Sequence, residues 1–172
     1  DIIDQRQISE GYRFVPVTST QLPFADACYD VVISNHVIEH VGDEHQQLDH
    51  LREIRRVLRP EGIAYLALPN RWMLVEPHYR LAFLSWLPDA WRTPYLRLMR
   101  RGNLYDCRPL TQAQIERAIS RAGLDFEYLG TRAFREFVTI EHKEGWPTEF
   151  LQILPNAILD KLAWINPTLI YR

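Results

Sequence analysis

The stretch that decides the fold is Tyr29-Asp30-Val31-Val32-Ile33-Ser34, which is followed by a helical pattern and then by a second apolar run at 63–68. A β-branched run of this kind is typical of a strand buried on both faces, which indicates a parallel sheet covered by helices. Residues 46–58 repeat apolar side chains at helical spacing and fill the opposite face with charge. The apolar positions are Leu48, Leu51, Ile54, Val57 and Leu58. We therefore predict two strands joined by an amphipathic helix.

The turn between this helix and the second strand is Arg59-Pro60-Glu61-Gly62. Proline cannot continue the helical hydrogen-bond ladder, and glycine allows a left-handed turn. Strand, helix and strand joined by short turns make a right-handed βαβ crossover, the repeating unit of doubly wound α/β folds. The expected fold class is therefore α/β, with a Rossmann-like, doubly wound and mostly parallel sheet.

The rest of the chain predicts further elements around this unit. We expect a short strand at 12–17, a helix from Thr111 to Ala122 that Gly123 ends, strands at 124–129 and 133–141, a helix at 151–164 and a final strand at 167–171. Residues 71–109 interrupt the α/β pattern with tryptophans, tyrosines, arginines and prolines. Such a long interruption is typical of a functional insertion. We predict one domain over 1–172, with an inserted helical lid at 71–109 that contacts the substrate.

Composition narrows the class of protein. A chain of 172 residues that is 47% hydrophobic can bury one core, and a net charge of -2 provides no general attraction to nucleic acid. Cys28 and Cys107 have neither a disulfide framework nor the spacing of a zinc motif, so we expect no metal and a reducing, cytoplasmic location. No leader and no apolar run of roughly 20 residues is present, although Trp86-Leu87-Pro88 and Trp91 suit peripheral contact with a membrane surface.

Three pieces of the sequence, in order, carry a resemblance to a known family. They are Leu22-Pro23-Phe24 before the first strand, Val37-Ile38-Glu39-His40-Val41 after it, and Arg56-Val57-Leu58-Arg59-Pro60-Glu61-Gly62 at the end of the helix. The chain resembles class I S-adenosylmethionine-dependent methyltransferases of the ubiquinone-biosynthesis type, over residues 14–70 and again over 110–129. The resemblance implies an enzyme that transfers a methyl group from S-adenosylmethionine to a small-molecule acceptor or to a sugar- or lipid-linked one.

The resemblance also implies which residues bind the cofactor, at the carboxyl ends of the strands. Thr18 occupies the position of the family's acidic residue that bonds the adenine amino group, and the backbone amide of Ser19 is placed to bond a ring nitrogen. Leu22 follows at the family spacing. Asn35 and His36 should border the methionine portion of the cofactor. A simple turn at Thr18 and Ser19 is the alternative interpretation.

The amino-terminal end of the chain is expected to be incomplete. Asp1-Ile2-Ile3-Asp4 reads like the inside or end of a strand, and the resemblance makes Asp1 or Asp4 the carboxylate that holds the ribose hydroxyls. Frayed terminal residues are the other interpretation. The family's glycine-rich cofactor turn has no counterpart in residues 1–172, so we expect it upstream of Asp1.

Several side chains are candidates for the chemistry of methyl transfer. In-line positioning supplies much of the acceleration, and for a hydroxyl acceptor a nearby base helps. The candidate bases are His36, His40 and His78, together with Glu76. In the lid, Glu76, His78, Tyr79 and Tyr105 are the candidate substrate residues, since aromatic rings and neighbouring arginines suit an anionic or sugar-bearing acceptor.

Other interpretations remain open at this stage. His36 and His40 can pack or cap locally, and a metal site from His36, His40, Asp43 and His45 is conceivable on spacing. The lid can be a solvated helix packed on the sheet. The chain can also be a cofactor-free, methyltransferase-like binding or scaffolding module, or a nucleotide-dependent oxidoreductase on a similar sheet.

Overall fold

The computed structural model describes residues 11, 13–140 and 155–172. Its centre is the predicted strand, helix and strand: β1 (Tyr29–Asn35), α1 (Glu44–Val57) and β2 (Leu58–Pro69). β1 and β2 are parallel, with Val31 opposite Ile63 and Asn35 opposite Ala67. The predicted unit is therefore confirmed, and its strands carry their carboxyl ends to one edge of the sheet.

Local chemistry sets the ends of α1. The Asp43 carboxylate accepts a hydrogen bond from the Gln46 backbone N–H, and the Asp43 N–H donates to the Gln46 side chain, so the two residues form a capping box. The helix ends at Val57. The predicted turn at 59–62 lies inside β2, where the register shifts between the pairs Tyr29–Leu58 and Val31–Ile63. The turn residues thus form a bulge at the start of β2.

The sheet is mixed. β5 (Thr168–Tyr171) pairs with β2 in antiparallel register, with Leu66 opposite Tyr171, so the sheet order is β1-β2-β5. The strand predicted at 124–129 is present only as an isolated bridge between Tyr128 and Tyr171, with backbone hydrogen bonds joining Glu127 to Arg172. The α/β class is confirmed, and this three-stranded sheet has one parallel and one antiparallel strand pair instead of being mostly parallel.

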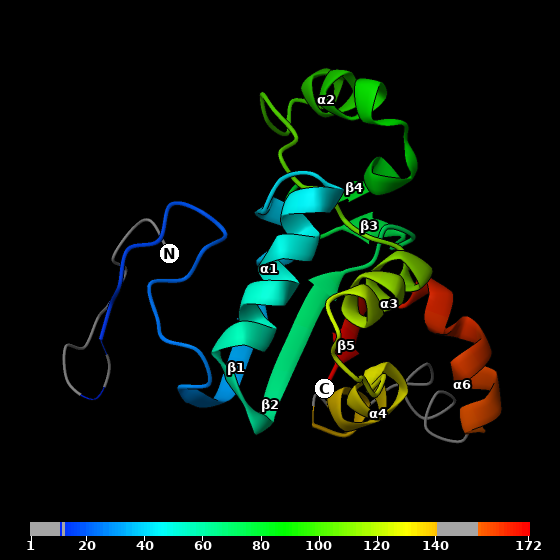
Figure 1. Cartoon of the computed structure of the whole chain (residues 1–172). Coiled ribbons are helices and arrows are strands. Elements are labelled where there is room, and N and C mark those ends of the chain that lie inside the picture. Colours follow the sequence, from blue (N-terminus) through cyan, green and yellow to red (C-terminus); the bar gives the residue numbers. More distant parts are fainter. Residues whose placement is uncertain (1–10, 12, 141–154) are drawn as a thin grey trace.

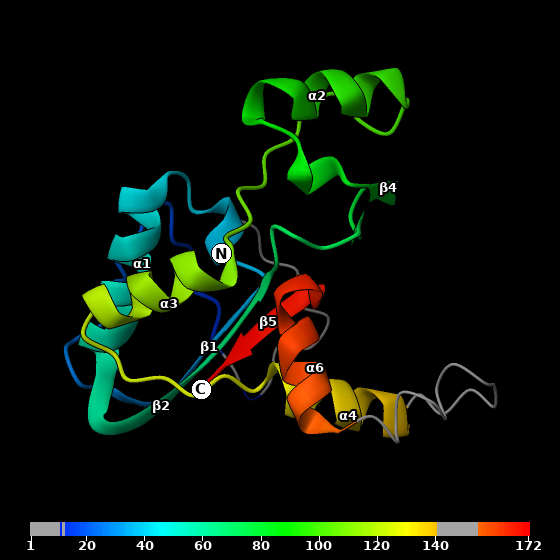
Figure 2. The same cartoon turned by 90° about the vertical axis from the view of Figure 1, so that its right-hand side faces the viewer.

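Helices lie on both sides of this sheet (Figure 2). On one side α1 packs beside α3 (Gln112–Arg121), which Thr111 caps as predicted, and on the other lie α4 (Gly130–Ile140) and α6 (Asn156–Leu162). The core lies between α1, α3 and the sheet, and its fully buried members include Ile38, Leu51, Leu68, Ile115 and Leu169. β1 is an edge strand whose other face exposes Val31 and Ile33.

Three further sequence predictions differ from the structure. The predicted strand at 133–141 is wrong, because residues 133–140 belong to helix α4, which Thr131 ties to Asp160 of α6. Residues 13–17 form no strand. The helix predicted at 151–164 begins only at Asn156, because Pro155 takes the N-cap position, and residues 151–154 lie outside the described part.

The lid stands beyond the carboxyl end of β2 (Figure 1). It contains a two-stranded hairpin, β3 (Val75–Glu76) with β4 (Leu81–Ala82), and two helices, η2 (Leu84–Trp86) and α2 (Asp89–Leu98). Its own small core consists of Leu81, Leu84, Leu96, Tyr105 and Cys107. The insertion predicted at 71–109 thus folds around a second, separate cluster.

Asn70 joins the lid to the sheet. Its side chain is fully buried, and its amide nitrogen donates to the carbonyls of Trp164 and Asn166 while its oxygen accepts from the Trp72 N–H. The next residue, Arg71, donates its N–H to the Leu110 carbonyl, which closes the base of the lid. The position of the lid over the strand ends is therefore fixed by hydrogen bonds at both of its ends.

Candidate functional site

The carboxyl end of β1 presents the first group of site residues. Ser34 is buried, and its hydroxyl lies 3.1 Å from His50 Nε2. Asn35 is exposed, and its side chain makes no hydrogen bond within the described part of the chain. His36 adopts φ 52° and donates its N–H to the Ala67 carbonyl, so the chain turns sharply as it leaves the strand. The turn places Asn35 and His36 at the strand tip, as predicted.

A buried carboxylate lies next to this tip. Glu39 is 1% exposed, and neither of its carboxylate oxygens has a hydrogen-bond partner within the described ranges. Its Oε1 lies 3.5 Å from His36 Nδ1 and 3.9 Å from His40 Nε2. A buried charge without a partner is costly, so this oxygen is set up to receive a cation or an N–H donor.

The lid contributes a second carboxylate and imidazole. Glu76 is 1% exposed, and its two oxygens accept from His78 Nδ1, at 2.7 Å, and from the Tyr79 backbone N–H. A carboxylate only accepts, so the Nδ1 atom of His78 carries the hydrogen in this pair. The His78 ring lies edge-on to that of His40, with 6.1 Å between centroids.

Tyr79, Tyr105 and Cys107 surround this pair. The rings of Tyr79 and Tyr105 are 5.6 Å apart, and Cys107 Sγ lies 3.8 Å from His40 Nδ1. Burial, followed by the neighbouring Asp106 carboxylate, raises the pKa of the Cys107 thiol and that of the Tyr79 phenol, each to about 12. Burial raises the pKa of Tyr105 as well, and its hydroxyl has no hydrogen-bond partner among the residues described.

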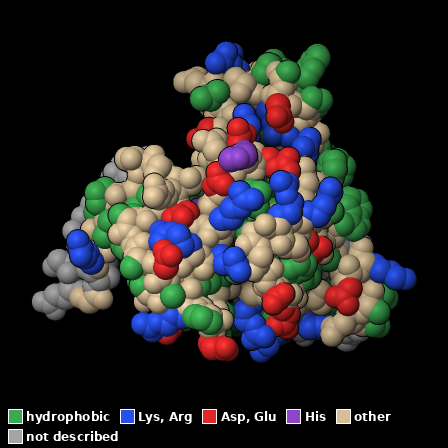
Figure 3. All heavy atoms as spheres, viewed as in Figure 1, with side chains coloured by type: hydrophobic (Ala, Val, Ile, Leu, Met, Phe, Trp, Pro, Cys, Tyr) green, Lys and Arg blue, Asp and Glu red, His purple; other side chains and the backbone are tan. Residues whose placement is uncertain are grey.

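These contacts connect the strand tip to the lid. His36 and His40 flank Glu39. Cys107 lies between His40 and the lid residues Glu76 and His78. The Arg108 N–H donates to the Glu39 carbonyl, and the Gln47 side chain bonds the carbonyls of Ile38 and Arg108. Figure 3 shows a histidine at the surface where the lid meets the sheet, with acidic and basic side chains beside it. The predicted lid residues Glu76, His78, Tyr79 and Tyr105 therefore lie together, within reach of the strand tip.

The predicted adenine residues lie on the segment before β1. Thr18 is exposed, and the Ser19 hydroxyl donates to the Gln21 carbonyl across 3.5 Å. Leu22 is held against the second half of α1, where its N–H donates to Glu53 and its carbonyl accepts from Arg56. Asp1, predicted to hold the ribose, is outside the described residues. The cofactor roles of all four stay predictions.

Sequence reasoning missed two members of the site. Glu39 lies inside the motif Val37-Ile38-Glu39-His40-Val41, but its burial cannot be read from the motif. Cys107 reaches His40 across a sequence separation of 67 residues, which no local pattern predicts. The four-residue metal site conceivable on spacing does not form, since the ligand groups that the described part assembles do not include His36, Asp43 or His45.

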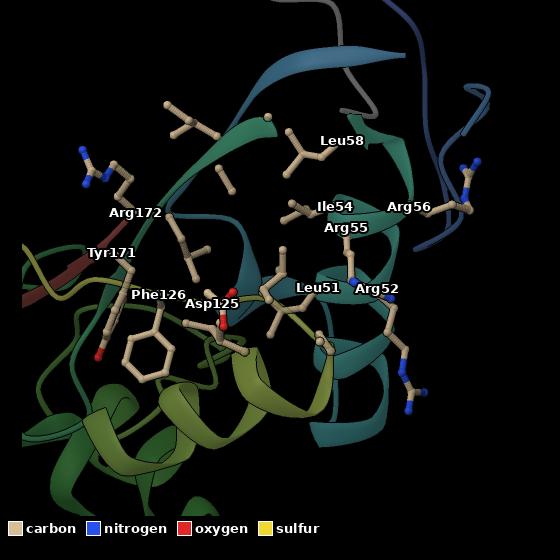
Figure 4. Close-up of a pocket in the computed structure, with 18 of the residues that line it drawn as sticks. Leu51, Arg52, Ile54, Arg55, Arg56, Leu58, Asp125, Phe126, Tyr171 and Arg172 are labelled. Carbon is tan, nitrogen blue, oxygen red and sulfur yellow. The ribbon is translucent and has the colours of Figure 1, made fainter. Parts of the chain in front are cut away.

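A large cavity lies at the opposite end of the sheet. It has a volume of about 830 Å³ and opens between the second half of α1, the start of β2 and the end of β5 (Figure 4). Apolar side chains such as Leu51, Ile54 and Phe126 line it beside Arg55 and Arg172. Ligands of open α/β sheets bind at the carboxyl ends of the strands. This cavity is at the amino end of β2, so we do not assign the cofactor to it.

Comparison with known proteins places this arrangement in a class. Residues 2–66 match the family described as a methyltransferase domain. The chain therefore carries methyltransferase domain sequence and is related to S-adenosylmethionine-dependent methyltransferases. The predicted resemblance is confirmed.

Three similar proteins show how much of the chain is matched and at what sequence identity. A protein of Mycolicibacterium smegmatis named as an S-adenosylmethionine-dependent methyltransferase is 45% identical over 51 residues, which cover 30% of this chain and 19% of that one. The ubiquinone biosynthesis O-methyltransferase of Rhizobium leguminosarum bv. trifolii is 30% identical over 128 residues, 73% of this chain and 47% of that one. A solved SAM-dependent methyltransferase of Thermotoga maritima superposes with a TM-score of 0.47 at 19% identity, covering 66% of this chain and 47% of that one. The chain thus spans less than half the length of these relatives.

The strand tip suits part of S-adenosylmethionine. The cofactor carries a cationic sulfonium and an amino group, and the carboxylate of Glu39 lacks a hydrogen-bond donor among the described residues. At the end of β1, Asn35 offers an amide that makes no hydrogen bond to the residues described. Residues 1–172 contain no Gly-x-Gly turn.

Proposed function

We propose that the protein to which this chain belongs transfers a methyl group from S-adenosylmethionine to a hydroxyl group of its acceptor. The observation that carries the proposal is the continuous set of contacts from the tip of β1, through Glu39 and His40, to the lid residues Glu76 and His78. These contacts support a site in which the candidate cofactor residues at the strand tip face the candidate acceptor residues of the lid.

The tip of β1 is the cofactor side of this site. Asn35 and Glu39 would hold the methionine portion, and Thr18, Ser19 and Asp1 keep the adenosine roles that the resemblance implies. Leu22, bonded to Glu53 and Arg56 in the second half of α1, lies toward the other end of the sheet. When bound, the cofactor supplies an electrophilic methyl group. The contribution of the chain is to orient this group toward the lid, since in-line placement supplies much of the acceleration.

His36 is the proton acceptor in this proposal. It follows the strand tip directly, and the Glu39 carboxylate lies 3.5 Å behind its Nδ1 atom. A buried carboxylate orients an imidazole and stabilises it once it takes the proton of the acceptor hydroxyl. A modest rotation of the ring converts the contact into a hydrogen bond. His40, 3.9 Å from the same oxygen, is the second candidate.

The lid provides the acceptor side. Tyr79 and Tyr105 offer ring faces, which suit a planar or sugar-bearing acceptor. On α2 and just beyond it, Trp91, Leu98 and Met99 are exposed beside Arg97, which suits an acceptor linked to lipid at a membrane surface. Among the described residues, no helix is both long and apolar enough to cross a bilayer. We extend the proposal to a cytoplasmic enzyme that contacts membranes only peripherally.

The first test is cofactor binding by the full-length protein. We expect S-adenosylhomocysteine to raise the thermal unfolding midpoint and NAD to leave it unchanged, because ligands stabilise only the folded state that binds them. Failure of S-adenosylhomocysteine to stabilise the protein would contradict the proposal and favour a cofactor-free binding module. Stabilisation by NAD alone would favour an oxidoreductase.

The second test concerns the base. With labelled S-adenosylmethionine and a panel of phenolic, sugar and lipid-linked hydroxyl acceptors, we expect His36→Gln to lower kcat roughly 100-fold while S-adenosylhomocysteine still binds. His45→Gln on the exposed start of α1 is the matched control and should retain full activity. Full activity of the His36 variant would exclude this residue as the proton acceptor.

A further inference from the structure

Cys107 lies where two groups of potential metal ligands meet. In one group it is joined by Glu76 and His78 of the lid hairpin, and in the other by His40 and Asp106. Within each group the ligand atoms all lie within 4.8 Å of one another. The residues come from separate segments, because His40 belongs to η1 (Ile38–His40), after β1, and Cys107 precedes α3. Only the fold brings them together.

The donor atoms of this cluster match one class of metal ion. A thiol, two imidazoles and a carboxylate are the ligand types of tetrahedral Zn²⁺, whereas Mg²⁺ and Ca²⁺ prefer oxygen alone. In such a site neighbouring ligand atoms are roughly 3.5 Å apart, so the spacing within the group of Glu76, His78 and Cys107 has to contract by up to about 1.3 Å. His40 shares a group with Cys107 and not with the other two, so its ring has to turn further to join them. His40 and His78 have side chains 41% and 42% exposed, and they are therefore free to turn toward the buried Cys107 and Glu76.

The charge of the cluster also suits a divalent cation. A bound carboxylate at Glu76 and a bound thiolate at Cys107, whose proton leaves to solvent, would carry two negative charges that a Zn²⁺ ion compensates. The Asp106 carboxylate, 3.7 Å from Cys107 Sγ, also favours a cation there. Glu76 and His78 already approach to 2.7 Å through a shared hydrogen. A zinc ion can take the place of that hydrogen, since both side chains then turn a lone pair toward the metal.

We propose that Cys107, His78, Glu76 and His40 together bind one Zn²⁺ ion, which fastens the lid to the segment that follows β1. The site is closed by four protein ligands, as structural zinc sites are. The role of the ion is to stabilise the lid over the strand tip. The zinc proposal does not depend on the methyl-transfer proposal, because the ion would bind and stabilise the protein without cofactor or acceptor. Local packing of Cys107 against Leu81 and Leu96 is the competing explanation.

The test uses the full-length protein after removal of metals with a chelator. We expect one equivalent of Co²⁺ to produce a thiolate-to-cobalt charge-transfer band, and one equivalent of Zn²⁺ to displace it. Cys107→Ser should abolish the band and weaken Zn²⁺ binding at least about 100-fold. Cys28→Ser is the matched control, since the sequence contains only these two cysteines, and it should keep both band and affinity.

Two further measurements keep the test decisive. Zn²⁺ should raise the thermal unfolding midpoint of the parent protein and not that of Cys107→Ser. His40→Ala, at a half-exposed position, should fold normally and still lose most of the zinc affinity. Absence of a charge-transfer band in the parent, or unchanged Zn²⁺ affinity in both variants, would overturn the proposed site whatever the methyl-transfer assays show.

Discussion

Two regions of the molecule bury different side chains. One is the sheet with its helices α1 and α3, and the other is the lid at 71–109. The first region has a large aliphatic core, with members such as Leu48, Leu51 and Leu68, and buries the polar side chains of Ser34 and Gln47 at its margin. The lid has a core of a few leucines, and beside it lie the buried polar groups Glu76 and Arg92. Apolar packing is non-directional, while buried polar groups need specific partners. The main core therefore consists mostly of non-directional apolar packing, while the lid depends more on specific polar contacts.

The largest effect should come from truncating one leucine in each region. Leu51→Ala should lower the free energy of unfolding by about 3 kcal/mol, because it opens a cavity in the main core. Leu96→Ala removes the same atoms from the lid core and should mainly speed amide hydrogen exchange over 71–109. Denaturant unfolding and hydrogen exchange of the full-length protein measure both. Equal global destabilisation by the two variants would show that the regions unfold as one.

An intermediate effect should come from the junction between the regions. Asn70→Ala leaves the carbonyls of Trp164 and Asn166 and the Trp72 N–H without their partner, which should cost about 2 kcal/mol. We also expect faster hydrogen exchange on both sides of the junction, at Arg71 and in the segment after Ala163. Asn156→Ala, in the first turn of α6, is a control outside the junction. Faster hydrogen exchange confined to the lid, with exchange in α6 unchanged, would contradict the role of Asn70 in linking the lid to the segment before β5.

The smallest effect should be the pH dependence of the sheet region. Burial lowers the pKa of His50, whose ring contacts the Ser34 hydroxyl. A lowered pKa means that the unfolded chain takes up a proton more readily than the folded protein, so this contribution is complete above about pH 6.5 and is lost as the pH falls below it. The urea midpoint should therefore drop less between pH 7 and pH 5 in His50→Gln than in the parent. His45→Gln, on the exposed side of α1, should keep the parental drop.

Prediction from sequence succeeded where local patterns and burial agree. The helix predicted at 46–58, which the structure has at 44–57, and the strands on either side follow from apolar spacing and from the proline that stops the helix. It failed at 133–140, where aromatic and β-branched residues favoured a strand although the segment packs against β5 as helix α4. Propensity is a weak guide for such a segment, because the neighbours it packs against decide its state.

By itself the sequence determined the strand, helix and strand at the centre, the place of the lid, and the resemblance to methyltransferases. Periodicity and turn chemistry are local, so they can be read without coordinates. Only the tertiary structure decided that Glu39 is buried without a hydrogen-bond donor in the described part, and that Cys107 meets His40, Glu76 and His78. Such contacts depend on how distant segments pack, and no local pattern in the chain encodes them.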